Sequence, residues 1–275
     1  MQEKVFAPER LLGLLGNPVG HSLGPLLHNW AFEQENLPWV YMSWSVLGRD
    51  LDTFLAAVRI LPIYGLSVTI PHKRSVFSAL DRCSQAAQKT GAVNTLYWSQ
   101  DELCGDNTDC AGFAAPLRDL APGLESALIL GSGGAARACI VALQDLGLDR
   151  IIVSSRNQER LQELESTFGI KSVSWGEKKQ SLAQLLVNAT PVGMSGPKQG
   201  ETPVSAQDLQ GFVWVYDLVY NPLDTRLMQE ARGVGCQTIS GLEMFLHQAR
   251  AQFRLWSGLE FDVRQARELL RPHLG

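Results

Sequence analysis

Two stretches of the sequence carry residue types that can transfer a proton. "GLSVTIPHK" ends an apolar run at Thr69, and Pro71 prevents the strand from continuing, which places Lys73 at the edge of a sheet. "GDNTDCAGF" places Asp109 and the polar residues before it on a turn that precedes a helical pattern. A lysine and an aspartate from separate loops can exchange the proton of an alcohol, although Asp109 alone could be only an N-cap.

A glycine turn in the middle of the chain predicts a nucleotide site. In "LILGSGGAARACIVAL" an apolar strand leads through the turn into a helix, and Gly131, Gly133 and Ala136 satisfy the pattern G-x-G-x-x-[G/A]. The first two glycines permit a tight turn and let a diphosphate approach the backbone, while the helix presents unpaired N–H groups to it.

The end of the next strand favours NADP over NAD. An NAD site needs an acidic residue about 20 residues beyond the glycine turn, to accept a hydrogen bond from the ribose. The sequence there reads "IIVSSRNQER", with Ser155 and Arg156 at the strand end and Arg160 one helical turn later. Two guanidinium groups suit a 2′-phosphate, which a carboxylate would repel. The alternative is that both arginines are only solvated side chains at the start of a helix.

Alternating elements predict an α/β fold in two halves. The first half combines strand-like runs with helical patterns, namely strands at 11–15, 40–46, 66–70 and 93–98 and helices at 25–36, 50–61 and 72–90. The second half has uniformly apolar strands in "ALILG", "RIIVSS", "LLVNAT" and "VWVYDLV", which are typical of a parallel sheet covered on both faces. The last two helical stretches, "GLEMFLHQARAQFRLWSG" and "FDVRQARELL", are expected to pack back across the molecule.

Composition excludes several classes of function. The 275 residues are 45% hydrophobic and 19% charged, as in a soluble globular protein, and a net charge of −4 provides no basic face for nucleic acid. No apolar run reaches the roughly 18 to 20 residues that span a bilayer. Met1–Lys4 lacks the apolar core of a signal peptide. The five cysteines form no CxxC pair and the five histidines show no metal-ligand spacing, so we expect a reducing cytosol and no bound metal.

An ordered series of motifs makes the chain resemble the shikimate dehydrogenase family from Gly16 to Gly258. The motifs are the HSxxP loop at 21–25, "VTIPHK", "GAVNT", "GDNTDCAG", "GSGGAARA", "NATPVGM", "YDLVYNPLDTRLMQEARGVG" and "GLEMFLHQA". The resemblance implies a two-domain α/β fold. Residues 1–110 plus 242–275 are expected to form the N-terminal substrate-binding catalytic domain, and residues 111–241 a Rossmann-like NADP domain.

The same resemblance implies an activity. The family reversibly reduces 3-dehydroshikimate to shikimate with NADPH, on the cytoplasmic route to chorismate and the aromatic amino acids. The implied partner is this small-molecule substrate, without nucleic acid or membrane, and the implied assembly is a monomer or a homodimer.

Residues at matching positions acquire implied roles. Lys73 and Asp109 are implied to be the catalytic pair, which exchanges the proton of the reacting hydroxyl while a hydride moves to or from the nicotinamide. The implied substrate contacts come from both halves of the sequence: Ser22 and Tyr220 near the carboxylate, Gly24 in the same loop as Ser22, and Thr69, Asn94 and Gln248 at the ring hydroxyls. The implied cofactor contacts follow the glycine turn and the later strands: Gly131, Ser132, Gly133, Gly134, Ala135, Ser155, Arg156, Asn157, Arg160, Asn188, Thr190, Met194, Leu218 and Gly241. Met194 could instead be a packing residue.

One substrate position departs from the family pattern. The family reads Ser-x-Ser-Pro and this chain reads Ser22-Leu23-Gly24-Pro25, so one of two hydroxyl donors to the carboxylate is absent. A hydrogen bond to a charged group contributes about 1.5–3 kcal/mol, so its loss weakens binding about tenfold to a hundredfold unless water or Tyr220 replaces it. Either Gly24 makes room for a bulkier carboxylate end, such as that of quinate, or the site is weaker for shikimate.

Two other functions stay open on the sequence alone. A quinate or quinate/shikimate dehydrogenase is favoured by Gly24, but the arginine pair weighs against the forms that prefer NAD. A nucleotide-binding regulator without turnover has no need for Lys73 and Asp109, so their retention argues against that function.

Overall fold

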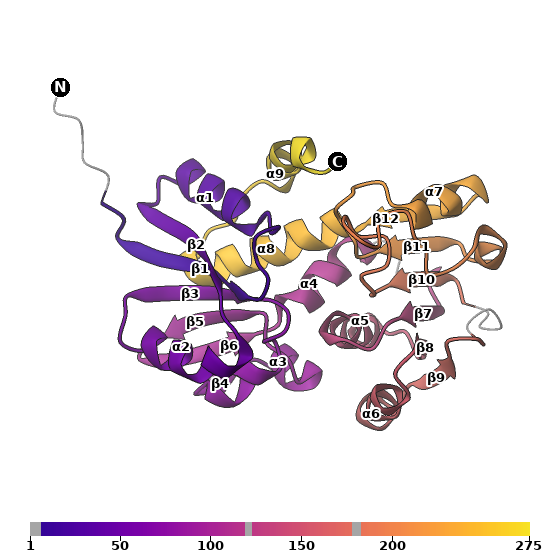
Figure 1. The fold of residues 1–275 in the computed structure, drawn as a ribbon, viewed down its shortest axis with the longest axis horizontal. Coiled ribbons are helices and arrows are strands. Elements are labelled where there is room, and N and C mark those ends of the chain that lie inside the picture. Colours follow the sequence, from indigo (N-terminus) through magenta and orange to yellow (C-terminus); the bar gives the residue numbers. More distant parts are fainter. Residues whose placement is uncertain (1–6, 119–122, 178–182) are drawn as a thin grey trace. The chain divides into compact units, whose positions relative to one another are not determined.

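The computed structural model of the chain describes residues 7–118, 123–177 and 183–275, so Met1–Lys4 lie outside it. The chain divides into two compact units (Figure 1). Unit 1 comprises Met1–Thr108 and Ala249–Leu270, and unit 2 comprises Asp109–Gln248 and Arg271–Gly275. Among the described residues, no helix is both long and apolar enough to cross a membrane, and no cluster of three or more His, Cys, Asp or Glu could hold a metal.

Unit 1 contains a mixed sheet of six strands. The strand order is β2-β1-β3-β5-β6-β4, in which β1 pairs in parallel with β2 and β3, whereas β5 is antiparallel to β3 and β6. The strands are β1 (Arg10–Gly16), β2 (Trp39–Ser45), β3 (Ile63–Val68), β4 (Arg82–Cys83), β5 (Thr95–Ser99) and β6 (Glu102–Asp106). The ends of β1, β3 and β6 and the start of β5 therefore lie at one edge of the sheet.

Four helices and part of a fifth belong to unit 1 in the described chain. They are α1 (Gly24–Gln34), α2 (Leu51–Val58), α3 (Gln85–Thr90), α9 (Val263–Leu270) and the second half of α8 (Gly241–Ser257). The indole of Trp256 on α8 donates to the carbonyl of Leu96 at 3.0 Å. The ring of Phe253 packs against Phe32 of α1 and against Phe261, which precedes α9. The expectation that the last helices pack back onto the first domain is confirmed, and Figure 1 shows α8 beside the strands of this sheet.

The glycine at position 65 explains how closely α8 approaches the sheet. A Cβ atom built on Gly65 in β3 would overlap the indole of Trp256, so only glycine admits that ring. The close approach lets Gln252 of α8 form hydrogen bonds with Ser67 in β3 and Thr95 in β5.

One sequence prediction in unit 1 is wrong, and the strands β4 and β6 were missed. Residues 72–90 do not form one helical segment. They contain a 3₁₀ turn (Ser75–Ala79), β4 and α3, because Ser84 accepts a hydrogen bond from the amide of Ala87 at 3.1 Å and starts a new helix there. Strand β6 was not expected; it forms a hairpin with β5 through a tight turn in which Gln100 has a positive φ of 56°.

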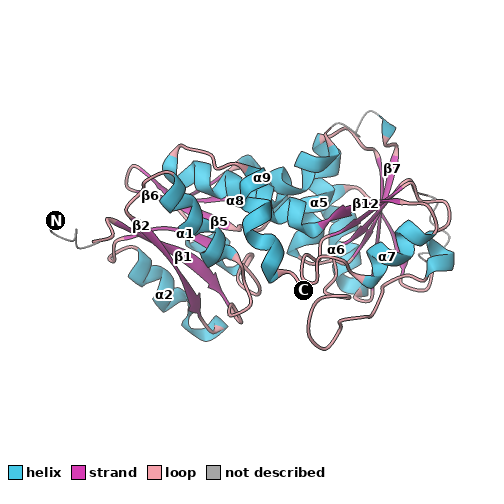
Figure 2. Cartoon of the chain, turned by 90° about the horizontal axis from the view of Figure 1, so that it is seen from above, coloured by secondary structure: helices cyan, strands magenta, loops and turns pink. Residues whose placement is uncertain are grey.

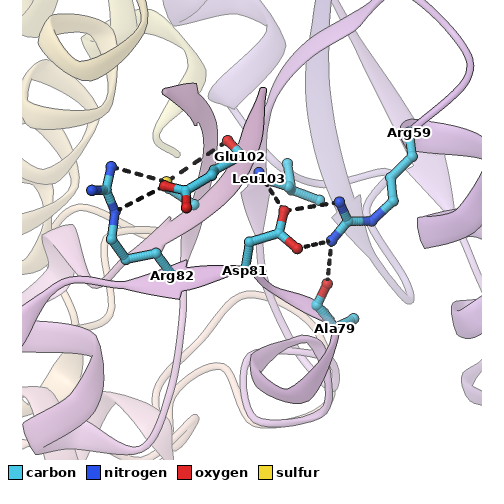
Figure 3. A network of polar contacts seen from close by, with 7 residues as sticks. Arg59, Ala79, Asp81, Arg82, Glu102 and Leu103 are labelled. Atoms are coloured by element: carbon cyan, nitrogen blue, oxygen red, sulfur yellow. Dashed lines mark hydrogen bonds and ion pairs between the residues drawn. The ribbon is translucent and has the colours of Figure 1, made fainter. Parts of the chain in front are cut away.

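A polar network fixes β4 and β6 at the far edge of this sheet (Figure 3). The guanidinium of Arg59 donates to both carboxylate oxygens of Asp81 at 2.9 and 3.0 Å and to the carbonyl of Ala79 at 2.9 Å. Asp81 also accepts from the amide of Leu103 in β6 at 2.7 Å, and these hydrogen bonds hold its pKa below the usual value. The network ties the end of α2 to the strand that leads into the turn before Asp109.

Unit 2 contains a six-stranded parallel sheet in the order β12-β11-β10-β7-β8-β9. The strands are β7 (Ser126–Leu130), β8 (Arg150–Ser155), β9 (Lys171–Ser174), β10 (Leu185–Asn188), β11 (Trp214–Asp217) and β12 (Gln237–Ser240). The four predicted apolar strands are the four central ones, and every residue of β7 and β10 is buried. The polar edge strands β9 and β12 lack that apolar signal and were not expected.

Helices cover both faces of this parallel sheet (Figure 2). Helices α5 (Gly134–Asp145) and α6 (Gln158–Phe168) lie on one side and α7 (Arg226–Gly233) on the other. The chain passes from one unit to the other within α4 (Thr108–Ala114), within α8 and after α9, between Leu270 and Arg271. The predicted parallel sheet between two helical layers is confirmed.

Candidate active site

The loop that enters α1 presents a serine hydroxyl beside the start of the helix. The hydroxyl oxygen of Ser22 accepts a hydrogen bond from the amide of Gly24, the first residue of α1, at 3.1 Å. A Cβ atom built on Gly24 would lie 3.3 Å from that oxygen and 3.7 Å from the hydroxyl of Tyr41. The position at which the chain lacks a serine is therefore flanked by two hydroxyl groups, and the second of them belongs to a residue that sequence reasoning missed.

Tyr41 begins a buried chain of hydrogen bonds that crosses unit 1. Its hydroxyl donates to Ser67 at 2.7 Å, and Ser67 donates to the side-chain oxygen of Gln252 at 2.8 Å. The amide group of Gln252 donates to the carbonyl of Asn94 and to the hydroxyl of Thr95, both at 3.1 Å. Burial raises the pKa of Tyr41 far above its usual value, so its hydroxyl keeps its proton. These hydrogen bonds connect Tyr41 in β2 with Asn94, the residue before β5.

Lys73 and Asn94 lie on neighbouring segments at the same edge of the sheet. Thr69 follows β3 directly, and its amide donates to the carbonyl of Leu15 at 2.8 Å. The carbonyl of Lys73 accepts from the amide of Val93 at 2.7 Å, and the Lys73 side chain is half-buried. Three of the predicted site residues of unit 1, Thr69, Lys73 and Asn94, are thus carried by adjoining strand ends.

The same Asn94 fixes the start of the helix that carries Asp109. Its side-chain oxygen accepts from the amide of Thr108 at 2.8 Å, and its side-chain nitrogen donates to the Thr108 hydroxyl at 3.0 Å. Asn107 is buried and donates to the hydroxyl of Thr90 and the carbonyl of Ala92, both at 3.0 Å. Both residues before Asp109 are therefore held by unit 1.

Asp109 is the second residue of α4 and is 5% exposed. The N-cap precedes the first helical residue, which is Thr108, so the alternative interpretation of Asp109 as an N-cap is wrong. Lys73 and Asp109 fall in different units, and their action on one substrate stays a prediction.

The glycine turn of unit 2 fits a diphosphate. Gly131 has a φ of +118°, and a Cβ atom on it would lie 2.8 Å from the carbonyl oxygen of Ala189. A Cβ atom on Gly133 would meet no protein atom within 4 Å, whereas Ala136 is fully buried against the sheet. Because Gly133 has no side chain, it cannot cap the first N–H groups of α5, and an anion can accept from them.

The end of β8 fits a phosphorylated adenosine. The hydroxyls of Ser132 and Ser155 lie 2.8 Å apart, which joins the glycine turn to this strand end. Arg156 and Arg160 are both exposed, and the Arg156 guanidinium lies 5.2 Å from the centroid of the Trp175 ring. Asn157 caps α6 by accepting from the amide of Arg160 at 2.9 Å, so it has a structural role in addition to its predicted contact.

The loops after β10, β11 and β12 meet at the same edge of the parallel sheet. Asn188 is fully buried and accepts hydrogen bonds from the amide of Thr190 at 3.1 Å and from its hydroxyl at 2.6 Å. A Cβ atom on Gly241, at the start of α8, would overlap the backbone of Leu218, which accounts for the glycine. Met194 is 50% exposed, and its contact with the cofactor stays a prediction.

Tyr220 and Gln248 lie together in unit 2. The Tyr220 ring stacks on Phe245 with centroids 4.8 Å apart, and burial raises the pKa of its hydroxyl. Gln248 donates to the carbonyl of Phe245 at 3.0 Å. Their placement beside the residues of unit 1 stays a prediction.

Comparisons with known proteins agree on one family. A model of the shikimate dehydrogenase substrate-binding domain matches residues 14–96, and a model of the shikimate 5′-dehydrogenase C-terminal domain matches residues 241–271. The chain is 44% identical to shikimate dehydrogenase (NADP(+)) of Maridesulfovibrio salexigens, over 98% of this chain and 99% of that protein.

Two solved structures have the same fold as this chain. The shikimate 5-dehydrogenase of Thermus thermophilus in complex with NADP(H) and shikimate is 37% identical, with a TM-score of 0.85 over 96% of this chain and 99% of that one. The quinate dehydrogenase of Corynebacterium glutamicum in complex with NAD is 33% identical, with a TM-score of 0.88 over 96% and 98%. The predicted two-domain fold is confirmed, and the chain belongs to the shikimate dehydrogenase family.

Proposed function

We propose that the chain is an NADP-dependent shikimate dehydrogenase, which reversibly reduces 3-dehydroshikimate to shikimate in the biosynthesis of chorismate and the aromatic amino acids. One observation carries the proposal. The segment Val93–Asn94 binds the backbone of Lys73 on one side and the start of the Asp109 helix on the other. The backbone of Lys73 and the residue before Asp109 therefore bond to the same segment, which supports the proposed pair.

The proposed reaction divides between the two units. In the oxidation of shikimate, one hydroxyl loses its proton and the carbon that bears it loses a hydride, which leaves the ketone. A basic group of the pair, either the carboxylate of Asp109 or the unprotonated amine of Lys73, accepts this proton in the oxidation, and the corresponding acid returns it in the reduction. When bound, the nicotinamide supplies or accepts the hydride.

The proposed substrate contacts keep the roles expected from the sequence. Ser22 and the start of α1 bind the carboxylate. The hydroxyl of Tyr41 lies near Gly24, but it donates its proton to Ser67, so it does not replace the absent serine donor. Thr69, Asn94 and Gln248 bind ring hydroxyls, and Tyr220 lies near the carboxylate and the nicotinamide. The substrate domain would comprise residues 1–110 plus 242–275, and the NADP domain residues 111–241.

The proposed cofactor site follows the carboxyl ends of the parallel strands in unit 2. The diphosphate binds the turn at Gly131–Ala135, and the 2′-phosphate binds Arg156 and Arg160 beside Ser155 and Asn157. The other half of the cofactor extends over the loops of Asn188, Thr190, Met194, Leu218 and Gly241. The order of the strands supports a cofactor that extends from the end of β8, across β7, to the end of β10, because β8 and β10 flank β7 on opposite sides.

Location and assembly complete the proposal. We propose a cytoplasmic location, because the five cysteines form no CxxC pair. We also propose that the protein is a monomer or a homodimer. Light scattering of the purified protein would determine the assembly.

Absorbance at the NADPH band tests the proposed activity directly. The purified protein is mixed with NADP+ and shikimate, and the absorbance is expected to rise until equilibrium. Parallel reactions use NAD+ or quinate. No change with either substrate and either nucleotide would contradict the proposal and favour a nucleotide-binding regulator.

Quinate dehydrogenation is a second candidate because Gly24 places no side chain between the hydroxyls of Ser22 and Tyr41. Quinate carries an additional hydroxyl on the carbon that bears its carboxylate, and this space could admit it. The Gly24→Ser variant separates the two explanations of Gly24. A restored hydroxyl is expected to lower the KM for shikimate about tenfold, the effect of one hydrogen bond to a charged group. We also expect it to reduce any turnover of quinate.

Steady-state kinetics of both substrates check this prediction, with Gly20→Ser as the control in the same loop, where an added Cβ atom meets nothing. An unchanged KM for shikimate would refute the explanation that the site is weaker. Quinate turnover that survives Gly24→Ser would refute the explanation that Gly24 makes room.

A further inference from the structure

A buried carboxylate joins the loops that leave β10 and β11. Asp217, the last residue of β11, is fully buried. One of its oxygens accepts from the side-chain nitrogen of Asn188 at 2.9 Å and from the amide of Val219 at 3.1 Å. The other oxygen accepts from the hydroxyl of Thr225, the N-cap of α7, at 2.5 Å. The Asp217 side chain therefore links the end of β10, the turn after β11 and the start of α7.

Through Asn188, this carboxylate shapes the loop after β10. The side-chain nitrogen of Asn188 also donates to the carbonyl of Val192 at 3.1 Å, while its oxygen accepts from Thr190. The hydroxyl of Thr190 in turn accepts from the amide of Val192 at 3.2 Å. Since Asp217 occupies one donor of the Asn188 amide group, it fixes the orientation in which the other bonds form.

We infer that Asp217 is a positioning residue for the nicotinamide half of the cofactor, which it serves by holding the loops after β10 and β11 together. The inference rests on the proposed function. The glycine turn follows β7 and the arginine pair follows β8, so the adenosine half lies on that side of the sheet. The loops tied by Asp217 lie on the other side of β7, where the second half of a dinucleotide must extend.

The ionised form of Asp217 is the one that satisfies all three donors. The groups that face it are uncharged: the amide of Asn188 from β10, the N–H of Val219 from the following turn and the hydroxyl of Thr225 from α7. Burial raises the pKa of this carboxyl to about 6, although the three hydrogen bonds lower it. Below that pH the carboxyl gains a proton and loses one acceptor position, so the link to Thr225 must rearrange.

The variant Asp217→Asn tests the inference through direct binding. An asparagine keeps the shape and one acceptor oxygen but presents an NH₂ group to Thr225. We expect the Kd of NADPH, measured by titration calorimetry at pH 7.5, to rise about tenfold, the effect of one lost hydrogen bond to a charged group. The Kd of adenosine 2′-monophosphate, which carries the 2′-phosphate but neither the diphosphate nor the nicotinamide half, is expected to change less than about twofold.

A matched control and a pH series complete the experiment. The control is Asp208→Asn, because Asp208 accepts from the hydroxyl of Ser205 in the same unit but lies in a different turn. The second measurement is the ratio of the Kd of NADPH to the Kd of the nucleotide that lacks the nicotinamide half. In the unaltered protein, this ratio is expected to rise as the pH falls through about 6. Both ligands carry the 2′-phosphate, so its own titration cancels in this ratio. The ratio for Asp217→Asn is expected to stay constant with pH.

The possible results separate this inference from the proposed function. Equal weakening of both ligands by Asp217→Asn would show a merely structural role and overturn the inference, as would an unchanged Kd for NADPH. If Asp217→Asn does not fold, a pH-independent ratio in the unaltered protein would overturn it, and a ratio that rises below about pH 6 would support it. If the unaltered protein does not bind NADPH, the proposed function fails, and this inference fails with it.

Discussion

Replacement of Lys73 by alanine is expected to lower kcat for shikimate oxidation by about 10²–10⁴-fold, the usual contribution of a positioned acid or base. Lys73 is carried on the segment next to Val93 and Asn94, and its side chain is half-buried at the edge of the unit 1 sheet. Alanine removes the ammonium group but leaves the backbone hydrogen bond to Val93 intact. Shikimate and NADP+ should therefore still bind, which calorimetry of the variant would verify.

The matched control for this prediction is Arg74→Ala. Arg74 is the adjacent cation on the same segment, but its side chain is exposed and has no assigned role in the reaction. Its removal is expected to change kcat less than about threefold, which would separate the chemistry of Lys73 from a general loss of positive charge. Near-normal turnover by a folded Lys73→Ala variant would remove the lysine from the mechanism.

Removal of both Arg156 and Arg160 is expected to raise the KM for NADP+ about a hundredfold or more. Each guanidinium can form charge-assisted hydrogen bonds to a 2′-phosphate, and one such bond contributes about 1.5–3 kcal/mol. NAD+ lacks this phosphate, so its KM should change little and the preference for NADP+ should fall. Steady-state kinetics with both nucleotides measure the two effects.

Arg150→Ala is the control for the arginine pair, because Arg150 begins the same strand at the opposite edge of the sheet. It should leave the KM values of both nucleotides unchanged. If the double variant retained its preference for NADP+, the arginines would be only solvated side chains, as the sequence alone allowed.

Much of unit 2 can be predicted from sequence because its signals are local. The strands β7, β8, β10 and β11 are short apolar runs, and a strand followed by a glycine turn and a helix leaves few alternatives. Edge strands such as β9 are short and polar, so periodicity does not reveal them. In unit 1 the pattern over residues 72–90 resembles one helix, but Asp81 and Ser84 divide it through hydrogen bonds to β6 and α3.

The sequence predicts the candidate residues that carry chemistry and also Asn94, but not the other residues that hold them in place. Lys73 and Asp109 stand out by type and motif. Gln252 contacts Ser67 and Asn94 across more than 150 positions of sequence, and no local pattern contains such a contact. The one sequence signal for Gln252 is its position four residues after Gln248 on the same helix face. Asp217 likewise acquires its role only when β10 and β11 pair.

The central claim is that Lys73 and Asp109 act on one proton as a single unit, and a double-variant cycle in kcat tests it most directly. The rates of Lys73→Ala, Asp109→Asn and the double variant are compared with that of the unaltered protein. Residues that serve the same step are not additive, so the double variant is expected to be within about tenfold of the slower single variant. A double variant whose loss equals the product of the two single losses would contradict the claim.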